Sequence, residues 1–225
     1  MAYKALIFDL DGTLTDSLED LWISVNHSLR AMGWPERTLD EVKAFVGNGI
    51  HLLIERSVPH RTCPNKLEQC FQLFRSHYVE HCMDHTVPYP GISDMLAELN
   101  KEGYQMAIVS NKLQSGVNII YNRHYASLIH VAIGEHDGVR RKPAPDMIYE
   151  AITRLGVKKE ECVYLGDSDV DIRTAQAAGL PCISVLWGFR DKEFLLAHGA
   201  TTLAQEPTDI LNILHSNQPL PLLQS

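Results

Sequence analysis

Short apolar runs alternate with stretches of helical periodicity along most of the chain. The runs at residues 4–8, 105–109, 131–134, 162–165 and 182–185 have the length and composition of buried strands. Apolar residues that recur every three or four positions separate them, which is typical of amphipathic helices. Alternating strands and helices predict a parallel sheet that helices cover on both faces.

The stretch from residue 16 to residue 85 has a different pattern, because its periodicity is helical throughout and glycine is sparse. Apolar residues recur at helical spacing from Leu18 to Met32. The run Thr38–Glu41 is typical of a capping box that opens a second helix. A third helix is predicted over residues 65–81.

Together these patterns predict an α/β fold with a doubly wound, mostly parallel sheet and an inserted α-helical cap. The 225 residues are enough for one core and a small insert. We expect residues 1–15 and 86–225 to form the α/β core and residues 16–85 to form the cap.

Composition narrows the partners that we expect. Asp and Glu number 28 against 20 Lys and Arg, and the resulting net charge of −8 disfavours nucleic acid or an anionic membrane as the partner. No apolar run approaches the ~20 residues of a membrane span. Five cysteines without a CxxC pair are expected to be reduced thiols of a cytoplasmic protein. For the subunit number, we expect a monomer or a homodimer.

Two carboxylates follow the first predicted strand directly. Asp9 and Asp11 are separated by one residue, and Gly12 and Thr13 come next. Aspartate is a poor strand residue and is almost never fully buried without a partner, which favours a functional site. An ordinary Asp-Gly turn after an edge strand is the alternative.

Polar residues at three later segments favour the functional interpretation. Ser110-Asn111-Lys112 follows the second strand, and the run from Gly166 to Asp171 follows the fourth. Arg141–Asp146 begins a helix, which is predicted to run from Pro143. Ligand sites of open parallel sheets form beyond the carboxyl ends of the strands, so these groups are expected to meet in one crevice.

The order of DLDGT, a serine after the next strand, KPAPD and GDSDVD resembles the haloacid dehalogenase superfamily of phosphotransferases. These motifs span residues 9–171, which is most of the chain. The segment FVGNGI at residues 45–50 and the KPAPD form are similar to the phosphoglycolate phosphatase branch. The resemblance implies a Rossmann-like core and a cap that closes over the active site to expel water.

The resemblance also implies hydrolysis through an aspartyl-phosphate. Asp9 would be the nucleophile, and Asp11 would protonate the leaving alcohol and then activate water. Lys142 would offset negative charge on Asp9 and on the phosphoryl oxygens. Ser110 and the backbone amide of Asn111 would donate hydrogen bonds to the same oxygens.

Clustered carboxylates beside a phosphate need a cation, because two unit charges ~4 Å apart repel by ~4 kcal/mol at an effective dielectric of ~20. Mg²⁺ prefers such oxygen ligands. The resemblance implies Asp9, Asp167 and the backbone carbonyl of Asp11 as ligands. Asp171 is expected on the same helical face as Asp167, as a ligand or as a partner of one. Asp169 is expected to be a cap or a solvated charge.

Two loops are expected to contact the substrate. Gly12 and Thr13 lie next to the nucleophile, and Asn48 and Gly49 lie in a glycine-rich loop of the cap. Paired glycines expose backbone amides that suit a small carboxylate or phosphate, although a simple helix-helix turn explains them equally well. The resemblance favours 2-phosphoglycolate or a similarly small phosphate ester.

Other functions remain open on the same residues. A sugar phosphomutase and a pyrophosphatase would share the core, and a non-catalytic phospho-receiver domain would share the acidic pocket and the lysine. Thr13 weakly favours hydrolysis, since such mutases often carry valine there. Asp11 and the inserted cap argue against a receiver.

Two local patterns are expected to be structural. His77, His81 and His85 recur every four residues, as on a zinc-binding helix, but eleven histidines make chance spacing common. A solvated cap helix is therefore expected there. Trp187 and Phe189 are expected to pack in the core rather than to line the active site.

Overall fold

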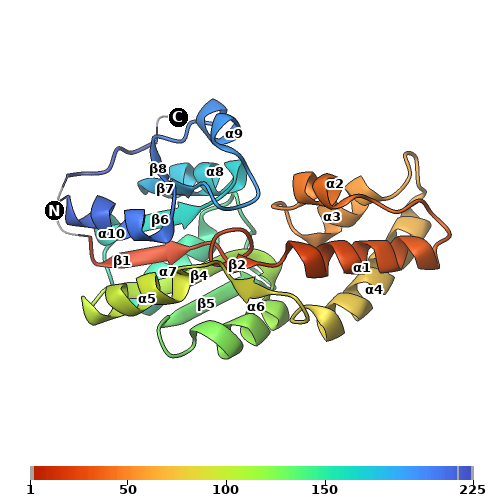
Figure 1. Ribbon diagram of the computed structural model, residues 1–225, viewed down its shortest axis with the longest axis horizontal. Coiled ribbons are helices and arrows are strands. Elements are labelled where there is room, and N and C mark those ends of the chain that lie inside the picture. Colours follow the sequence, from red (N-terminus) through yellow and green to blue (C-terminus); the bar gives the residue numbers. More distant parts are fainter. Residues whose placement is uncertain (1–2, 217, 224–225) are drawn as a thin grey trace. The chain divides into compact units, whose positions relative to one another are not determined.

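A computed structural model describes residues 3–216 and 218–223 of the chain (Figure 1). Two compact units make up the chain: the residues up to Thr15 together with those from Pro88 onward, and Asp16–Val87. The short strands β2 (Thr15–Asp16) and β3 (Val87–Pro88) pair where the chain passes from one unit to the other. Within the described residues, no helix is both long and apolar enough to cross a membrane.

A six-stranded parallel sheet forms the centre of the first unit, in the order β5-β4-β1-β6-β7-β8. Its strands are β1 (Ala5–Phe8), β4 (Gln105–Leu113), β5 (Val131–Glu135), β6 (Cys162–Gly166), β7 (Cys182–Val185) and β8 (Thr202–Ala204). This is the strand order of a doubly wound nucleotide-binding-type sheet. The chain adds strands on one side of β1 and then, from β6 onward, on the other side, so the switch point lies beside β1. The predicted fold class is confirmed, with β8 as an additional short strand.

The central strand β1 is buried on both faces, and all four of its side chains are at most 1% exposed. Ala5 and Ile7 pack in a cluster with α7 (Asp146–Leu155) and α8 (Asp169–Ala178). Leu6 and Phe8 point to the opposite face, because side chains alternate along a strand. Each large apolar side chain buried in this way contributes about 1.5–3 kcal/mol.

Strand register brings the carboxyl ends of three strands to one edge of the sheet. Phe8, the last residue of β1, is level with Ile108 of β4 and with Leu165 of β6. The residues that follow these positions therefore lie side by side at the point where the strand order reverses. This is the part of an open α/β sheet where ligands bind.

Further helices complete the unit: α5 (Ile92–Lys101), α6 (Gln114–Ile120), a π-helical turn at Tyr121–Tyr125, a 3₁₀ turn at Lys159–Glu161, α9 (Lys192–Ala197) and α10 (Pro207–His215). The predicted start of α7 at Pro143 is wrong, because the helix begins at Asp146. Pro145 explains the difference, since a residue that precedes proline is disfavoured in the helical conformation, and here that residue is Ala144.

Four helices make up the second unit within its described residues: α1 (Leu18–Ala31), α2 (Leu39–Phe45), α3 (Ile50–Ser57) and α4 (Pro64–His81). The capping box at α2 is confirmed, because Thr38 Oγ1 accepts from the N–H of Glu41 while a Glu41 carboxylate oxygen accepts from the N–H of Thr38. The prediction missed α3, which has only eight residues.

The spaced histidines of α4 do not converge on one point. The ring of His77 stacks between those of His27 and His81, with centroid separations of 4.1 and 4.3 Å. His85 lies beyond the helix, and its backbone N–H donates to the buried carboxylate of Asp20 at 3.0 Å. Burial and the two neighbouring imidazoles lower the pKa of His77.

Candidate active site

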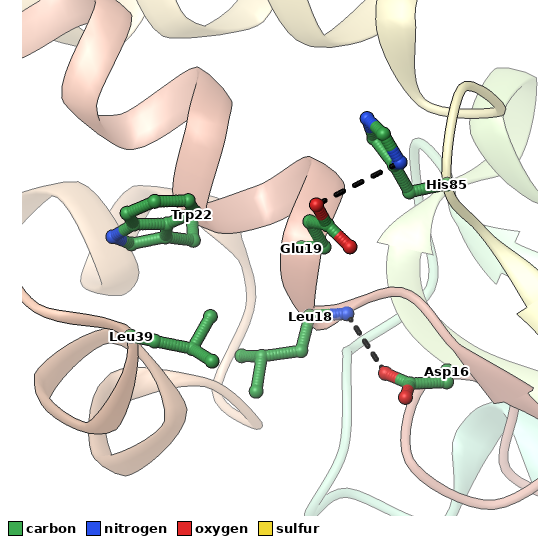
Figure 2. A pocket seen from close by; sticks show the side chains of 6 residues that line it. All are labelled: Asp16, Leu18, Glu19, Trp22, Leu39 and His85. Carbon is green, nitrogen blue, oxygen red and sulfur yellow. Dashed lines mark hydrogen bonds and ion pairs between the residues drawn. The ribbon is translucent and has the colours of Figure 1, made fainter.

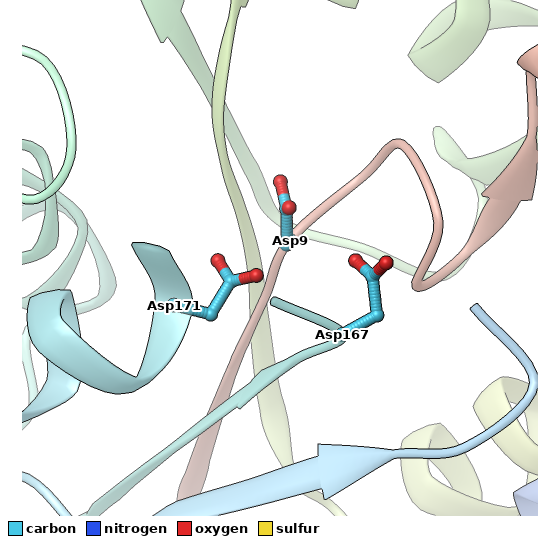
Figure 3. A group of neighbouring side chains, drawn as sticks. All are labelled: Asp9, Asp167 and Asp171. Carbon is cyan, nitrogen blue, oxygen red and sulfur yellow. The ribbon is translucent and has the colours of Figure 1, made fainter. Parts of the chain in front are cut away.

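Three aspartates gather at the carboxyl edge of the sheet. Asp9 directly follows β1, Asp167 directly follows β6, and Asp171 lies in the first turn of α8. Figure 3 shows their carboxylates directed into one space, and one oxygen of each lies within 4.8 Å of the others. Among the described residues, no other group of three or more His, Cys, Asp or Glu side chains meets this distance. The structure thus brings Asp9 and Asp167 together from positions 158 residues apart in the sequence.

A buried lysine lies between two of these carboxylates. Lys142 Nζ is 2.8 Å from Oδ1 of Asp9 and 2.8 Å from Oδ1 of Asp171, and it donates to the hydroxyl of Tyr164 at 3.1 Å. Burial alone would lower the pKa of Lys142, but the charges of Asp171 and Asp9 raise it above its ordinary value. The ammonium group therefore stays charged and partly neutralises the cluster.

Asp171 uses both of its oxygens in contacts with the protein. Its Oδ1 accepts from Lys142 and from the Tyr164 hydroxyl (3.0 Å), and its Oδ2 accepts from the hydroxyl and the N–H of Ser168. Ser168 is the N-cap of α8 and Asp171 is the third helical residue, so the two form a capping box. The expectation that Asp171 shares a helical face with Asp167 is wrong, because Asp167 precedes the N-cap.

Of the two roles expected for Asp169, a helix cap or a solvated charge, the helix cap is wrong. Ser168 occupies the N-cap position, and the carboxylate of Asp169 pairs instead with Arg173 one turn further along α8. Ser168 stands directly before the helix, the position from which a short polar side chain reaches the free N–H groups of the first turn.

Asp167 is held by groups from two loops. Its Oδ1 accepts from the Thr13 hydroxyl at 3.2 Å, and its Oδ2 accepts from the N–H of Phe189 at 2.8 Å. A Cβ atom at Gly12 would lie 2.4 Å from the Asp167 carboxylate, and one at Gly188 would lie 2.3 Å from the Cβ of Asp167. Both positions therefore require glycine for the close approach.

The prediction that Trp187 and Phe189 pack in the core rather than line the active site holds for the burial of Phe189 only. Trp187 is half-buried, and the segment contacts Thr13 and Asp167 of the site. Phe189 is buried, while Trp187 Nε1 donates to the backbone carbonyl of Thr13 at 2.9 Å. The loop after β7 thus fixes the position of the loop after β1. An aromatic residue in the sequence indicated packing, but it gave no signal of these backbone contacts.

The cluster changes the acidity of its own members. Burial raises the pKa of Asp9 well above its ordinary value, and the charges of Asp171 and Asp167 add to this effect against the opposing charge of Lys142. Burial and Asp171 raise the pKa of Asp167 to about 7. Each carboxylate is thus costly to ionise beside the others without an additional cation.

Asn111 links the end of β4 to the Lys142 loop. Its side-chain amide donates to the carbonyl of Lys142 at 3.1 Å, and its side-chain oxygen accepts from the N–H of Lys142 at 2.8 Å. Ser110 is buried, and its hydroxyl accepts from the N–H of Lys112. The sequence predicted roles for Ser110 and for the backbone amide of Asn111. It did not predict the two hydrogen bonds between the Asn111 side chain and the backbone of Lys142.

Asp11 makes an ion pair that the sequence did not predict. Lys112 Nζ lies 2.8 Å from Oδ1 and 3.1 Å from Oδ2 of Asp11, and the lysine side chain is 3% exposed. The signal in the sequence was the position of Lys112 directly after Ser110 and Asn111. A lysine near the end of a strand is usually solvated, so this signal alone was weak.

The two predicted cap residues belong to the second unit. Asn48 and Gly49 precede α3 and are half-buried, and Gly49 is the N-cap of that helix with a φ of 84°. This left-handed conformation explains the glycine at position 49 without reference to a ligand.

The second unit also has a pocket of about 370 Å³ near the start of α1 (Figure 2). Its lining residues are Asp16, Leu18, Glu19, Trp22, Leu39 and His85. The carboxylates of Asp16 and Glu19 make this pocket unsuitable for the phosphate of an anionic ester. Among the lining residues only His85 can become positively charged, on protonation, and its Nδ1 lies 3.7 Å from Glu19.

A doubly wound sheet with a buried aspartate cluster and a paired lysine at its switch point defines a class of hydrolases. The sequence pattern of the haloacid dehalogenase-like hydrolases matches residues 6–185, and the chain belongs to this family. The predicted family and the expectation of an enzyme of the phosphatase class are confirmed.

Several relatives within this family are named phosphoglycolate phosphatase. The chain is 33% identical over 202 residues to a phosphoglycolate phosphatase of Mesorhizobium japonicum, covering 85% of this chain and 86% of the relative. It is 30% identical over 187 residues to one of Aquifex aeolicus, covering 83% and 86%. A solved structure from Lactobacillus delbrueckii subsp. bulgaricus superimposes with a TM-score of 0.91 at 33% identity, covering 95% of this chain and 99% of that one.

Proposed function

We propose that this protein is a Mg²⁺-dependent phosphatase that hydrolyses a small phosphate monoester, 2-phosphoglycolate, through an aspartyl-phosphate on Asp9. The observation that carries the proposal is Asp9 at the switch point of the sheet, paired with Lys142 and next to Asp167. The names of the relatives support the choice of substrate.

The charges of the site suit one divalent cation. If all four were ionised, Asp9, Asp11, Asp167 and Asp171 would carry four negative charges against the two positive charges of Lys112 and Lys142, an excess of two that a divalent cation would balance. Carboxylate oxygens are the ligands that Mg²⁺ prefers. Asp9 and Asp167 would hold the ion with the carbonyl of Asp11, and the ion would neutralise charge on the transferring phosphoryl group.

Asp171 is better suited to hold Lys142 than to bind the ion directly. Its two oxygens already accept four hydrogen bonds, from Lys142, Tyr164 and Ser168. A carboxylate offers about four acceptor positions, so these contacts use its capacity. We therefore assign Asp171 to orienting the catalytic lysine.

The chain's own residues would perform the covalent steps. Oδ1 of Asp9 accepts from the N–H of Leu10 at 2.7 Å and pairs with Lys142, which fixes the orientation of the carboxylate for attack on phosphorus. Lys142 would offset charge on the phosphoryl oxygens, and the Ser110 hydroxyl would donate to one of them. Asp11 would give a proton to the leaving alcohol and later take one from the attacking water.

A panel of phosphate esters with and without Mg²⁺ tests this function. We expect inorganic phosphate to be released only with the cation, and kcat/KM to be highest for 2-phosphoglycolate among small esters, sugar phosphates and pyrophosphate. A requirement for a sugar bisphosphate would identify a phosphomutase instead. A long-lived phosphoprotein without turnover of p-nitrophenyl phosphate would identify a phospho-receiver.

The stability of the metal-free protein is expected to fall as pH rises from about 4 to about 7. The folded-state pKa of Asp167 is about 7, whereas that of an unfolded chain is about 3.9. Between these values the folded state binds more protons than the unfolded state, so the free energy of unfolding decreases with pH. Thermal unfolding in EDTA at pH 5 and pH 7.5 measures the effect, and Mg²⁺ should raise Tm more at pH 7.5.

The variant Asp167→Asn is the control for this pH dependence. It removes the titrating group, so the decrease in Tm between pH 5 and pH 7.5 should be smaller than in the wild type. An equal decrease in both proteins would show that the dependence arises elsewhere.

A further inference from the structure

Two lysines divide the carboxylates of the site between them. Lys142 pairs with Asp9 and Asp171, and Lys112 pairs with Asp11. Asp9 and Asp11 are two residues apart, yet each has its own cation. Beyond its charge, the reaction described above gives Lys112 no role, although an ammonium group is costly to bury and is rarely kept without a reason.

An irregularity in β4 places this lysine. The register between β4 and β5 shifts between Val109 and Leu113, so the last part of the strand departs from regular pairing. Such irregularities redirect side chains and are frequent beside active sites. Here the redirected side chain of Lys112 reaches the loop after β1, 101 residues earlier in the chain.

Two glycines make room for the lysine. A Cβ atom at Gly116, inside α6, would lie 3.3–3.4 Å from three carbons of the Lys112 side chain. One at Gly134, in β5, would lie 2.6 Å from the backbone carbonyl oxygen of Lys112. Glycine in the middle of a helix weakens it and usually has a packing reason. At Gly116 that reason is the path of the lysine side chain.

We propose that Lys112 is a positioning residue that holds the Asp11 carboxylate in the orientation needed for proton transfer. The inference rests on the proposed function, in which Asp11 is the acid and base. As the bond from Asp9 to phosphorus forms and the ester P–O bond breaks, the proton of Asp11 passes to the departing oxygen. Asp11 then remains as a carboxylate, and contacts at 2.8 and 3.1 Å from Lys112 to both of its oxygens fix its orientation.

The test compares Lys112→Met with the wild type on two substrates in single-turnover measurements of enzyme phosphorylation. An alkyl ester such as 2-phosphoglycolate needs a proton on its leaving oxygen, whereas p-nitrophenolate leaves without one. Positioned proton transfer contributes about 10²–10⁴-fold. We expect Lys112→Met to lower the rate of enzyme phosphorylation by about 10- to 100-fold with the alkyl ester and by less than about threefold with p-nitrophenyl phosphate. Equal slowing of both substrates, or unchanged rates, would overturn the proposal.

Gly116→Ala tests the same inference without removing a charge. The added methyl group would lie 3.3–3.4 Å from three carbons of the lysine side chain and would force it to shift by a few tenths of an ångström, while alanine favours the helix. We expect an unchanged or raised Tm together with a selective loss on the alkyl ester, and this result decides the question if Lys112→Met does not fold. If the ratio of the phosphorylation rates with the two substrates is the same in Gly116→Ala as in the wild type, the proposal is contradicted. Lys101→Met removes an exposed lysine that pairs with Glu98 and should leave both rates unchanged.

Asp11→Asn separates this inference from the proposed function. If Asp11→Asn lowers the phosphorylation rate strongly and selectively with the alkyl ester while Lys112→Met shows no such selectivity, only the role of Lys112 fails. If Asp11→Asn itself leaves the rate on 2-phosphoglycolate unaltered, the acid-base role of Asp11 fails, and the proposed mechanism fails with it.

Discussion

Replacing Asp9 with asparagine is expected to lower kcat by at least about a thousandfold, because an amide cannot form the covalent phosphoryl intermediate. The fold should remain intact, since the asparagine oxygen can still accept from the N–H of Leu10. The substitution also removes one charge from a cluster in which burial and Asp171 already raise the pKa of Asp9. The metal-free variant should therefore unfold at the same temperature as the wild type or above it at pH 7.5.

Phosphate release from 2-phosphoglycolate and a thermal melt measure the two parts of this prediction. Asp169→Asn is the matched control, because Asp169 lies two residues after Asp167 but pairs with Arg173 instead of facing the cluster. It should keep wild-type activity. Residual activity of Asp9→Asn above about a hundredth of the wild type would exclude Asp9 as the nucleophile.

Replacing Lys142 with methionine is expected to have the largest effect on stability. The side chain is 1% exposed, and its loss leaves Asp9 and Asp171 without the cation that they share. Removal of one partner from a buried ion pair typically costs about 3–5 kcal/mol. We expect a loss of this size in the free energy of unfolding by urea at pH 7.5, together with loss of turnover.

The double variant Lys142→Met with Asp171→Asn separates the two effects. Neutralising Asp171 removes part of the uncompensated charge, so it should recover some of the stability without recovering activity. If the single variant unfolds within about 1 kcal/mol of the wild type, the buried pair contributes little to the fold.

The sequence predicted which strands would carry the site but not how the site is assembled. Asp9 and Asp167 could be placed together because each follows an apolar run and parallel strands end at a common edge. Asp171 was assigned to the wrong geometry, because helical periodicity does not reveal that Ser168 is the N-cap. Periodicity likewise ended β4 at residue 109, before the irregular segment that carries Lys112.

Short elements and backbone contacts were beyond the reach of the sequence pattern. The strand β8 has three residues and α9 has six, too few for a period to be recognised. The contacts of Asp167 with Phe189 and of Asn111 with Lys142 use backbone groups, which every residue possesses. Such contacts depend on loop conformation and leave no mark on residue type.

The capping role of Asp171 has a consequence for comparing this chain with its relatives. One carboxylate both completes the first turn of α8 and fixes Lys142, so selection for a folded helix and selection for turnover act on the same side chain. A descendant that had abandoned catalysis would still benefit from keeping an aspartate there. Its presence in a homologue is therefore poor evidence of an active enzyme, whereas Asp9, which caps no helix here, is the more informative position to compare.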